Sequence, residues 1–232
     1  MHAKSKKNQT INLALFDFDG TLYPKDSFTG FIFYTLSKRH IVKNGLKILP
    51  WIQAYYLNLY PAHAMRPKLY QSMFKDIPVD FVDQLSQDYA KKIIKKLDSN
   101  LMKQLHKHQQ RGDHIVLVSA SIDLYLKYVC KFLNIELICT VTEIQNGHLT
   151  GFYQSEDCSR EQKKRRILDQ YNLSNYQHIY AYGNSEEDLE MLSIADFTYM
   201  VGEDKPLPKV DDSQDHDMWK KGKRPLNPMP IF

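Results

Sequence analysis

The sequence predicts an α/β fold, a Rossmann-like, doubly wound and mostly parallel sheet with an all-helical cap domain inserted into it. Short apolar runs, typical of strands buried on both faces, alternate with helical segments in the pattern of βαβ units. A long helical segment with no convincing strand interrupts this alternation after the first strand. The length of 232 residues is sufficient for one α/β domain and an insertion of moderate size.

The first expected strand is the apolar run at residues 11–16, which ends in carboxylates and a Gly-Thr turn. Residues 27–97 are then predicted to be helical. An Asn-Gly pair between two alternating runs is a strong hairpin signal. The further expected elements are a helix at 99–110, a strand at 114–119, a helix at 122–133, a strand at 136–139, a hairpin at Asn146-Gly147, a helix at 162–171, a strand at 178–182, a helix at 186–193 and a strand at 197–201.

These elements predict four parts of the chain. Residues 1–10 are a polar N-terminal extension, and residues 203–232 are a Pro-rich tail. Residues 11–24 and 99–202 form the α/β core, and residues 25–98 form the cap. The insertion thus divides the core after its first strand.

The charge is concentrated in the cap. The chain has a net charge of +4, but residues 25–98 hold 12 Lys and Arg against 6 Asp, and the rest holds 19 basic against 21 acidic residues. No basic stripe recurs outside the cap, so we expect no nucleic-acid partner. The basic excess, a net of +6, belongs to the inserted segment.

The sequence favours a cytoplasmic location. Three cysteines without paired spacing suit a reducing compartment, and residues 1–10 contain no apolar segment of a signal peptide. The most apolar stretch, residues 46–65, is interrupted by a lysine and two prolines and cannot span a bilayer comfortably.

An aromatic stripe lies in this same stretch. It consists of Trp51, Tyr55, Tyr56 and Tyr60 at near-helical spacing. Such a stripe is usually the core of packed helices. The alternative is peripheral contact of a basic, aromatic cap with an anionic or lipid surface.

Polar residues follow three of the expected strands, at the sheet edge where ligands collect in open α/β folds. Asp17 and Asp19 follow the first strand, Ser119 ends the second, and Asn184 opens an oxygen-rich turn that includes Asp188. Two neighbouring carboxylates repel each other unless a cation or a substrate compensates their charge. Taken singly, each site is also compatible with helix capping or a turn, and a lone Ser at the position of Ser119 is more often an N-cap.

A cationic run opens the helix expected at residues 162–171. Ser159 and Gln162 match a capping box ahead of it. Most of the run is expected to form a solvated helix face, and periodicity leaves open whether Lys163 or Lys164 points inward.

Together, the ordered series DFDGTL, VLVSAS, a lysine at a helix start and GNSEEDLEML resembles the four motifs of the haloacid-dehalogenase-like phosphohydrolases over about residues 11–202. It best matches the phosphoserine-phosphatase-like branch, whose helical cap lies between the first and second motifs. The resemblance implies that Asp17 is the nucleophile and Asp19 the general acid/base. It also implies phosphoryl-binding roles for Ser119 and Lys163.

The resemblance further implies a Mg²⁺ cofactor, held by the Asp17 side chain, the Asp19 carbonyl and Asn184. The family usually has aspartate at the position of Asn184, so we expect weaker Mg²⁺ binding, with Asp188 supplying negative charge from nearby. Arg160 stands where the family usually has glycine, which leaves Lys164 as the alternative to Lys163.

The expected function is a Mg²⁺-dependent phosphomonoester hydrolase that acts through an aspartyl-phosphate on a small phosphorylated metabolite, phosphoserine-like or a lipid phosphate. Two alternatives remain. One is a phosphotransferase with the same intermediate. The other is a catalytically weak module that binds phosphorylated ligands, because Asn184 replaces a charged metal ligand.

Overall fold

A five-stranded parallel sheet forms the centre of the computed structural model, which describes residues 11–204 and 206–210. The strand order is β3-β2-β1-β6-β7, so the first strand lies in the middle and pairs on both sides. The strands are β1 (Leu13–Phe16), β2 (His114–Ile122), β3 (Glu136–Thr140), β6 (Ile179–Gly183) and β7 (Phe197–Met200). This is the expected doubly wound α/β fold.

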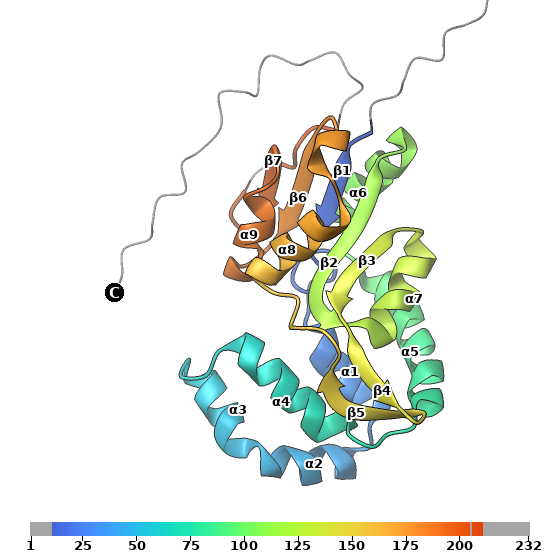
Figure 1. The fold of residues 1–232 in the computed structure, drawn as a ribbon, viewed down its shortest axis with the longest axis vertical. Helices are drawn as coiled ribbons and strands as arrows, with labels where there is room; N and C mark the ends of the chain where they lie inside the picture. The colour runs from blue at the N-terminus through green and yellow to red at the C-terminus, as the bar shows by residue number, and fades with distance from the viewer. Residues whose placement is uncertain (1–10, 205, 211–232) are drawn as a thin grey trace, which may run out of the picture.

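Both faces of the sheet are buried, as the continuous apolar runs predict. Ala14 and Phe16 of β1 belong to one core cluster, while the alternating residues Leu13 and Leu15 belong to another on the opposite face. The helices that follow and precede the strands cover these two faces (Figure 1). They are α6 (Ser99–Arg111), α7 (Asp123–Leu133), α8 (Glu161–Gln170) and α9 (Leu189–Leu192).

Helices fill the segment between β1 and α6, as the sequence predicts. They are α1 (Ser27–Thr35), α2 (Lys38–Lys47), α3 (Leu49–Tyr56), α4 (Ala62–Phe74) and α5 (Val79–Ile93), followed by a short 3₁₀ turn, Ile94–Lys96. Helices α2, α3 and α4 lie below the sheet in Figure 1, whereas α5 packs along α7 of the core. The insertion is therefore anchored to the core through its last helix.

The expected hairpin forms and joins the inserted helices. Strands β4 (Thr142–Gln145) and β5 (His148–Tyr153) flank Asn146-Gly147 and make a separate two-stranded sheet that packs on α4. Leu149 N–H donates to the Ile77 carbonyl at 2.9 Å, and Leu149 O accepts from Asp76 N–H at 2.8 Å. A small sheet from the core sequence thus supports the helical insertion.

Two expected elements differ in their ends. Strand β2 extends to Ile122, so Ser119 lies within the strand, where its pairing with β3 becomes irregular. The helix expected at 186–193 is a 3₁₀ turn at Glu186–Asp188 followed by the short helix α9. The expectations for the N-terminal extension and for most of the Pro-rich tail fall outside the described residues.

Candidate active site

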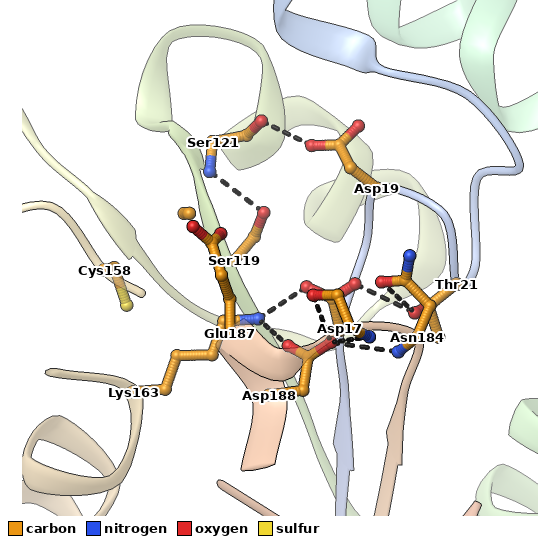
Figure 2. A network of polar contacts seen from close by, with 12 residues as sticks. Asp17, Asp19, Thr21, Ser119, Ser121, Cys158, Lys163, Asn184, Glu187 and Asp188 are labelled. Carbon is orange, nitrogen blue, oxygen red and sulfur yellow. Dashed lines mark hydrogen bonds and ion pairs between the residues drawn. The ribbon is translucent and has the colours of Figure 1, made fainter. Parts of the chain in front are cut away.

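Side chains from three adjacent strands meet at the carboxyl edge of the sheet (Figure 2). Asp17 directly follows β1, Ser119 lies in β2, and Asn184 directly follows β6, all three strands being neighbours. The Asp17 and Ser119 side chains are buried. The topology therefore brings these sequence-predicted residues to one place, as expected for an open α/β sheet.

Lys163, from the first turn of α8, lies between two carboxylates. Its Nζ donates to Asp17 Oδ1 at 2.5 Å and to Asp188 Oδ1 at 2.6 Å, and the whole side chain is buried. Burial by itself would lower the Lys163 pKa, but the attraction of the two carboxylates raises it above its usual value. A buried ammonium is tolerated only with such partners, so Lys163 is a fixed positive charge at this site.

The neighbouring Lys164 points away from the site. Its Nζ contacts Glu190 Oε2 at 3.3 Å and Ser193 Oγ at 3.2 Å near the surface. Of the two lysines that the sequence left open, Lys163 is the one beside Asp17.

The backbone conformation of Arg160 determines where α8 begins and so which lysine faces Asp17. Its φ of 52° and ψ of −127° lie in a region that favours glycine, the residue usual in the resembling family. The turn continues into α8 without a side-chain cap, so the expected capping box at Ser159 is wrong: the Ser159 carbonyl, rather than its hydroxyl, accepts from Gln162 N–H. The capping box forms instead at Ser185 and Asp188.

Asp188 holds the turn after β6. Its Oδ2 accepts from the N–H groups of Asn184 at 2.9 Å and Ser185 at 3.1 Å, while Oδ1 accepts from Lys163. A Cβ on Gly183 would lie 2.6 Å from the Asp188 Cβ, so only glycine fits there. Asp188 thus positions both the lysine and the backbone that presents Asn184.

Asp17 is held on both oxygens. Oδ1 contacts Lys163, and Oδ2 accepts from Thr21 Oγ1 at 2.9 Å. Burial raises the Asp17 pKa to about 7, against the opposing attraction of Lys163. A cation beside the second oxygen would favour the carboxylate form.

An oxygen cluster suited to a hard cation lies at that second oxygen. The Asn184 amide nitrogen donates to Asp17 Oδ2 at 3.2 Å and to the Asp19 carbonyl at 3.0 Å. The opposite orientation of the amide would place its oxygen against these two acceptors. When the amide turns over, three oxygens converge, which fits Mg²⁺. Among the described residues, no group of three His, Cys, Asp or Glu side chains could hold a metal, so this site depends on an amide and a backbone carbonyl.

The Asp19 carboxylate points away from Asp17, as Figure 2 shows. It accepts from Ser27 N–H at 2.6 Å and from Ser121 Oγ at 2.5 Å. Burial raises its pKa to about 6, although these hydrogen bonds act in the opposite direction. This carboxyl group is therefore able to exchange a proton near neutral pH.

The family model for haloacid dehalogenase-like hydrolases matches residues 14–193. The chain belongs to this family. The expected fold is also confirmed, because a substrate-bound phosphoserine phosphatase aligns with a TM-score of 0.60 at 16% identity, over 82% of this chain and 86% of that chain.

Two further proteins resemble this hydrolase in sequence or in fold. Protein CicA of Caulobacter vibrioides is 25% identical over 188 residues, which are 79% of this chain and 83% of CicA. A protein of unknown function from Bordetella pertussis aligns with a TM-score of 0.67 at 20% identity, over 82% of this chain and 89% of that chain. The family and the fold together support the expected phosphatase class.

Sequence reasoning missed several residues of this hydrolase's site. Ser121 and Ser27 hold Asp19, and Thr21 holds Asp17. Ser121 and Thr21 stand inside the quoted motifs, so their hydroxyls were visible signals. Ser27 acts through its backbone, which no side-chain pattern reveals.

Arg66 was also missed, because its partners are far away in sequence. From α4 it donates to both oxygens of Asp157 at 2.8 Å and to both oxygens of Glu187 at 3.0 and 3.1 Å. Glu187 directly precedes Asp188, so this ion-pair cluster ties the inserted helices to the turn that supports the site. Among the described helices of this hydrolase, none is long and apolar enough to cross a membrane.

Proposed function

We propose that this hydrolase is a Mg²⁺-dependent phosphomonoesterase that acts through an aspartyl-phosphate. The observation that carries the proposal is the environment of Asp17, a carboxylate with a buried ammonium on one oxygen and the oxygen cluster of Asn184 and Asp19 beside the other. A phosphate monoester is a dianion, so an anionic nucleophile requires positive charge around it. Lys163 supplies part of that charge permanently.

Each site residue has a distinct role in the proposed reaction. Asp17 attacks phosphorus in line and forms the acyl phosphate, while the leaving alcohol takes a proton from Asp19. The Asp19 carboxyl group must first turn from Ser27 and Ser121 towards the phosphorus. Asp19 then removes a proton from water, which attacks phosphorus and releases Asp17 and inorganic phosphate. Lys163 and the Ser119 hydroxyl would bind the phosphoryl oxygens. Bound Mg²⁺, held by Asp17, Asn184 and the Asp19 carbonyl, would neutralise charge on the phosphoryl group.

The proposed substrate is a small phosphorylated metabolite, phosphoserine-like or a lipid phosphate. The structural relatives support the phosphoester class, since one is a phosphoserine phosphatase with its substrate and another is a cytosolic 5'-nucleotidase bound to cytidine. The nucleotidase aligns with a TM-score of 0.56 at 15% identity, over 82% of this chain and 71% of that chain. Transfer to an alcohol uses the same groups, and products formed with added alcohols would reveal a phosphotransferase.

The test measures phosphate release from p-nitrophenyl phosphate and from a panel of amino-acid, sugar, nucleotide and lipid phosphomonoesters, with Mg²⁺ and with EDTA. We expect Asp17→Asn to abolish release and Asp19→Asn to lower turnover by about 10²–10⁴-fold. Asp169→Asn, at an exposed carboxylate of α8, is the matched control and should leave activity unchanged. Undiminished hydrolysis by Asp17→Asn would contradict the proposed nucleophile.

A further inference from the structure

A band of exposed apolar side chains runs along α2, α3 and the loop that leads to α4. Half of the large hydrophobic side chains that are exposed in the described structure lie between residues 42 and 59. We call this band, together with the cations on α2, the α2–α3 face. Its apolar members are Val42, Leu46, Leu49, Trp51, Tyr55, Tyr56, Leu57 and Leu59.

The face is not the hidden core of the insertion. Helix α3 has no buried residue, and Trp51, Tyr55 and Tyr56 are all exposed, so the expectation that this aromatic stripe forms a helical core is wrong for them. The most exposed members of the face lie at the end of α3 and in the loop to α4, where Tyr56, Leu57 and Leu59 are exposed to 78%, 67% and 76%. An apolar patch of this kind marks an interaction surface.

Cations border the apolar band. On α2, the exposed residues Arg39, Lys43 and Lys47 follow one another at i, i+4 spacing, beside the parallel row of Lys38, Val42 and Leu46. None of these four cations forms an ion pair with any residue that the structure describes.

No carboxylate is available locally to neutralise them. Asp and Glu are absent from residue 27 to residue 75, the whole span of α1 to α4. The face therefore combines unneutralised positive charge with exposed aliphatic and aromatic groups.

We propose that the α2–α3 face docks on an anionic phospholipid bilayer. Burial of the exposed Leu57 and Leu59 side chains is favourable in an apolar phase. A bilayer offers such a phase and a nucleic acid does not. The lysines and arginine would contact anionic head groups, and aromatic side chains such as Tyr56 prefer the interface. The contact is interfacial, because no described helix could span the membrane.

Docking would bring the membrane close to the ion-pair cluster beside the active site. The exposed loop leads directly into α4, where Arg66 contacts Glu187, the neighbour of Asp188. The loop tip is thus roughly one to two helical turns from the ion-pair cluster beside the site. Binding to a bilayer requires no catalysis, so it is tested separately from the proposed phosphatase activity.

The experiment is co-sedimentation of the full chain with vesicles of phosphatidylglycerol and phosphatidylcholine, compared with phosphatidylcholine alone. We expect binding to the anionic vesicles only, weakened by salt. The variant Tyr56→Ser/Leu57→Ser/Leu59→Ser should bind at least about tenfold more weakly. The variant Lys43→Gln/Lys47→Gln should lose roughly tenfold as well.

Phe152→Ser/Leu168→Ser, which removes exposed apolar groups elsewhere, is the matched control and should bind like the unaltered protein. Thermal melting shows that each variant folds. The proposal is overturned if the unaltered protein does not bind anionic vesicles, or if the loop variant binds as well as the control. A dimer in light scattering that only the loop variant converts to monomer would also overturn it, since a second copy would then be the occupant.

Discussion

Arg66 offers the sharpest test of how the inserted helices are attached to the core. Substituting Arg66→Gln removes the guanidinium that pairs with Asp157 and Glu187 and leaves these two carboxylates facing each other. Burial would lower the Arg66 pKa, but both carboxylates raise it, so the side chain stays charged. The substitution therefore leaves the negative charges of Asp157 and Glu187 without a cation.

The loss of folding stability caused by Arg66→Gln follows from the burial of these side chains. The side chains of Arg66, Asp157 and Glu187 are exposed to only 19%, 11% and 22%, so water replaces the lost contacts incompletely. Removing one partner of a fully buried pair costs about 3–5 kcal/mol. Allowing for the partial exposure, we expect the free energy of unfolding to fall by about 2–3 kcal/mol, which lowers the Tm by about 4–12 °C for a domain of this size.

The measurement is urea and thermal unfolding, with Arg165→Gln as the matched control. Arg165 is 63% exposed, and its contacts are 3.6 and 3.9 Å long. Exposed pairs contribute little, so this control should cost less than about 0.5 kcal/mol. Adding Asp157→Asn and Glu187→Gln to Arg66→Gln should restore part of the stability. Equal losses for Arg66→Gln and Arg165→Gln would refute the reasoning.

Two further predictions concern the turns around the site. Asn184→Asp should raise Mg²⁺ affinity about tenfold, because a second anionic side chain then joins Asp17 at the cluster. Calorimetric titration tests this, and a gain no larger than that of the exposed control Asn175→Asp would contradict it. Arg160→Gly should raise the free energy of unfolding by about 1 kcal/mol by relieving its positive φ. Asn134→Gly, at an ordinary left-handed position with φ 53° and ψ 54°, should change it by less than about 0.5 kcal/mol. Urea unfolding compares the two, and no gain for Arg160→Gly would count against strain at this turn.

Local patterns were sufficient for much of the fold. The buried strand before Asp17 and the hairpin at Asn146-Gly147 were predicted because each depends on neighbours in sequence: an apolar run, or a turn that two residues dictate. The error at Ser159 has the same origin. A side-chain pattern indicated a cap there, but the backbone conformation of Arg160 starts the helix in another way.

The candidate site was predictable in its members but not in its contacts. Asp17, Asp19, Ser119 and Asn184 follow or lie in strands, and parallel pairing brings strand ends together whatever the details of packing. Which lysine faces Asp17 was undecided, because one residue of register on a helix turns a side chain by about 100°. The turn at Arg160 settles that register.

The sequence by itself determined the order of the strands and helices, the insertion and the oxygen-rich edge of the sheet, because these follow from periodicity and from motifs that are local. Only the tertiary structure decided which groups meet across long separations. It pairs Arg66 with Glu187, places Ser121 on Asp19 and leaves α3 exposed. Such contacts depend on how whole elements pack. The sequence pattern of an apolar helix is the same whether the helix packs on the core or on another surface.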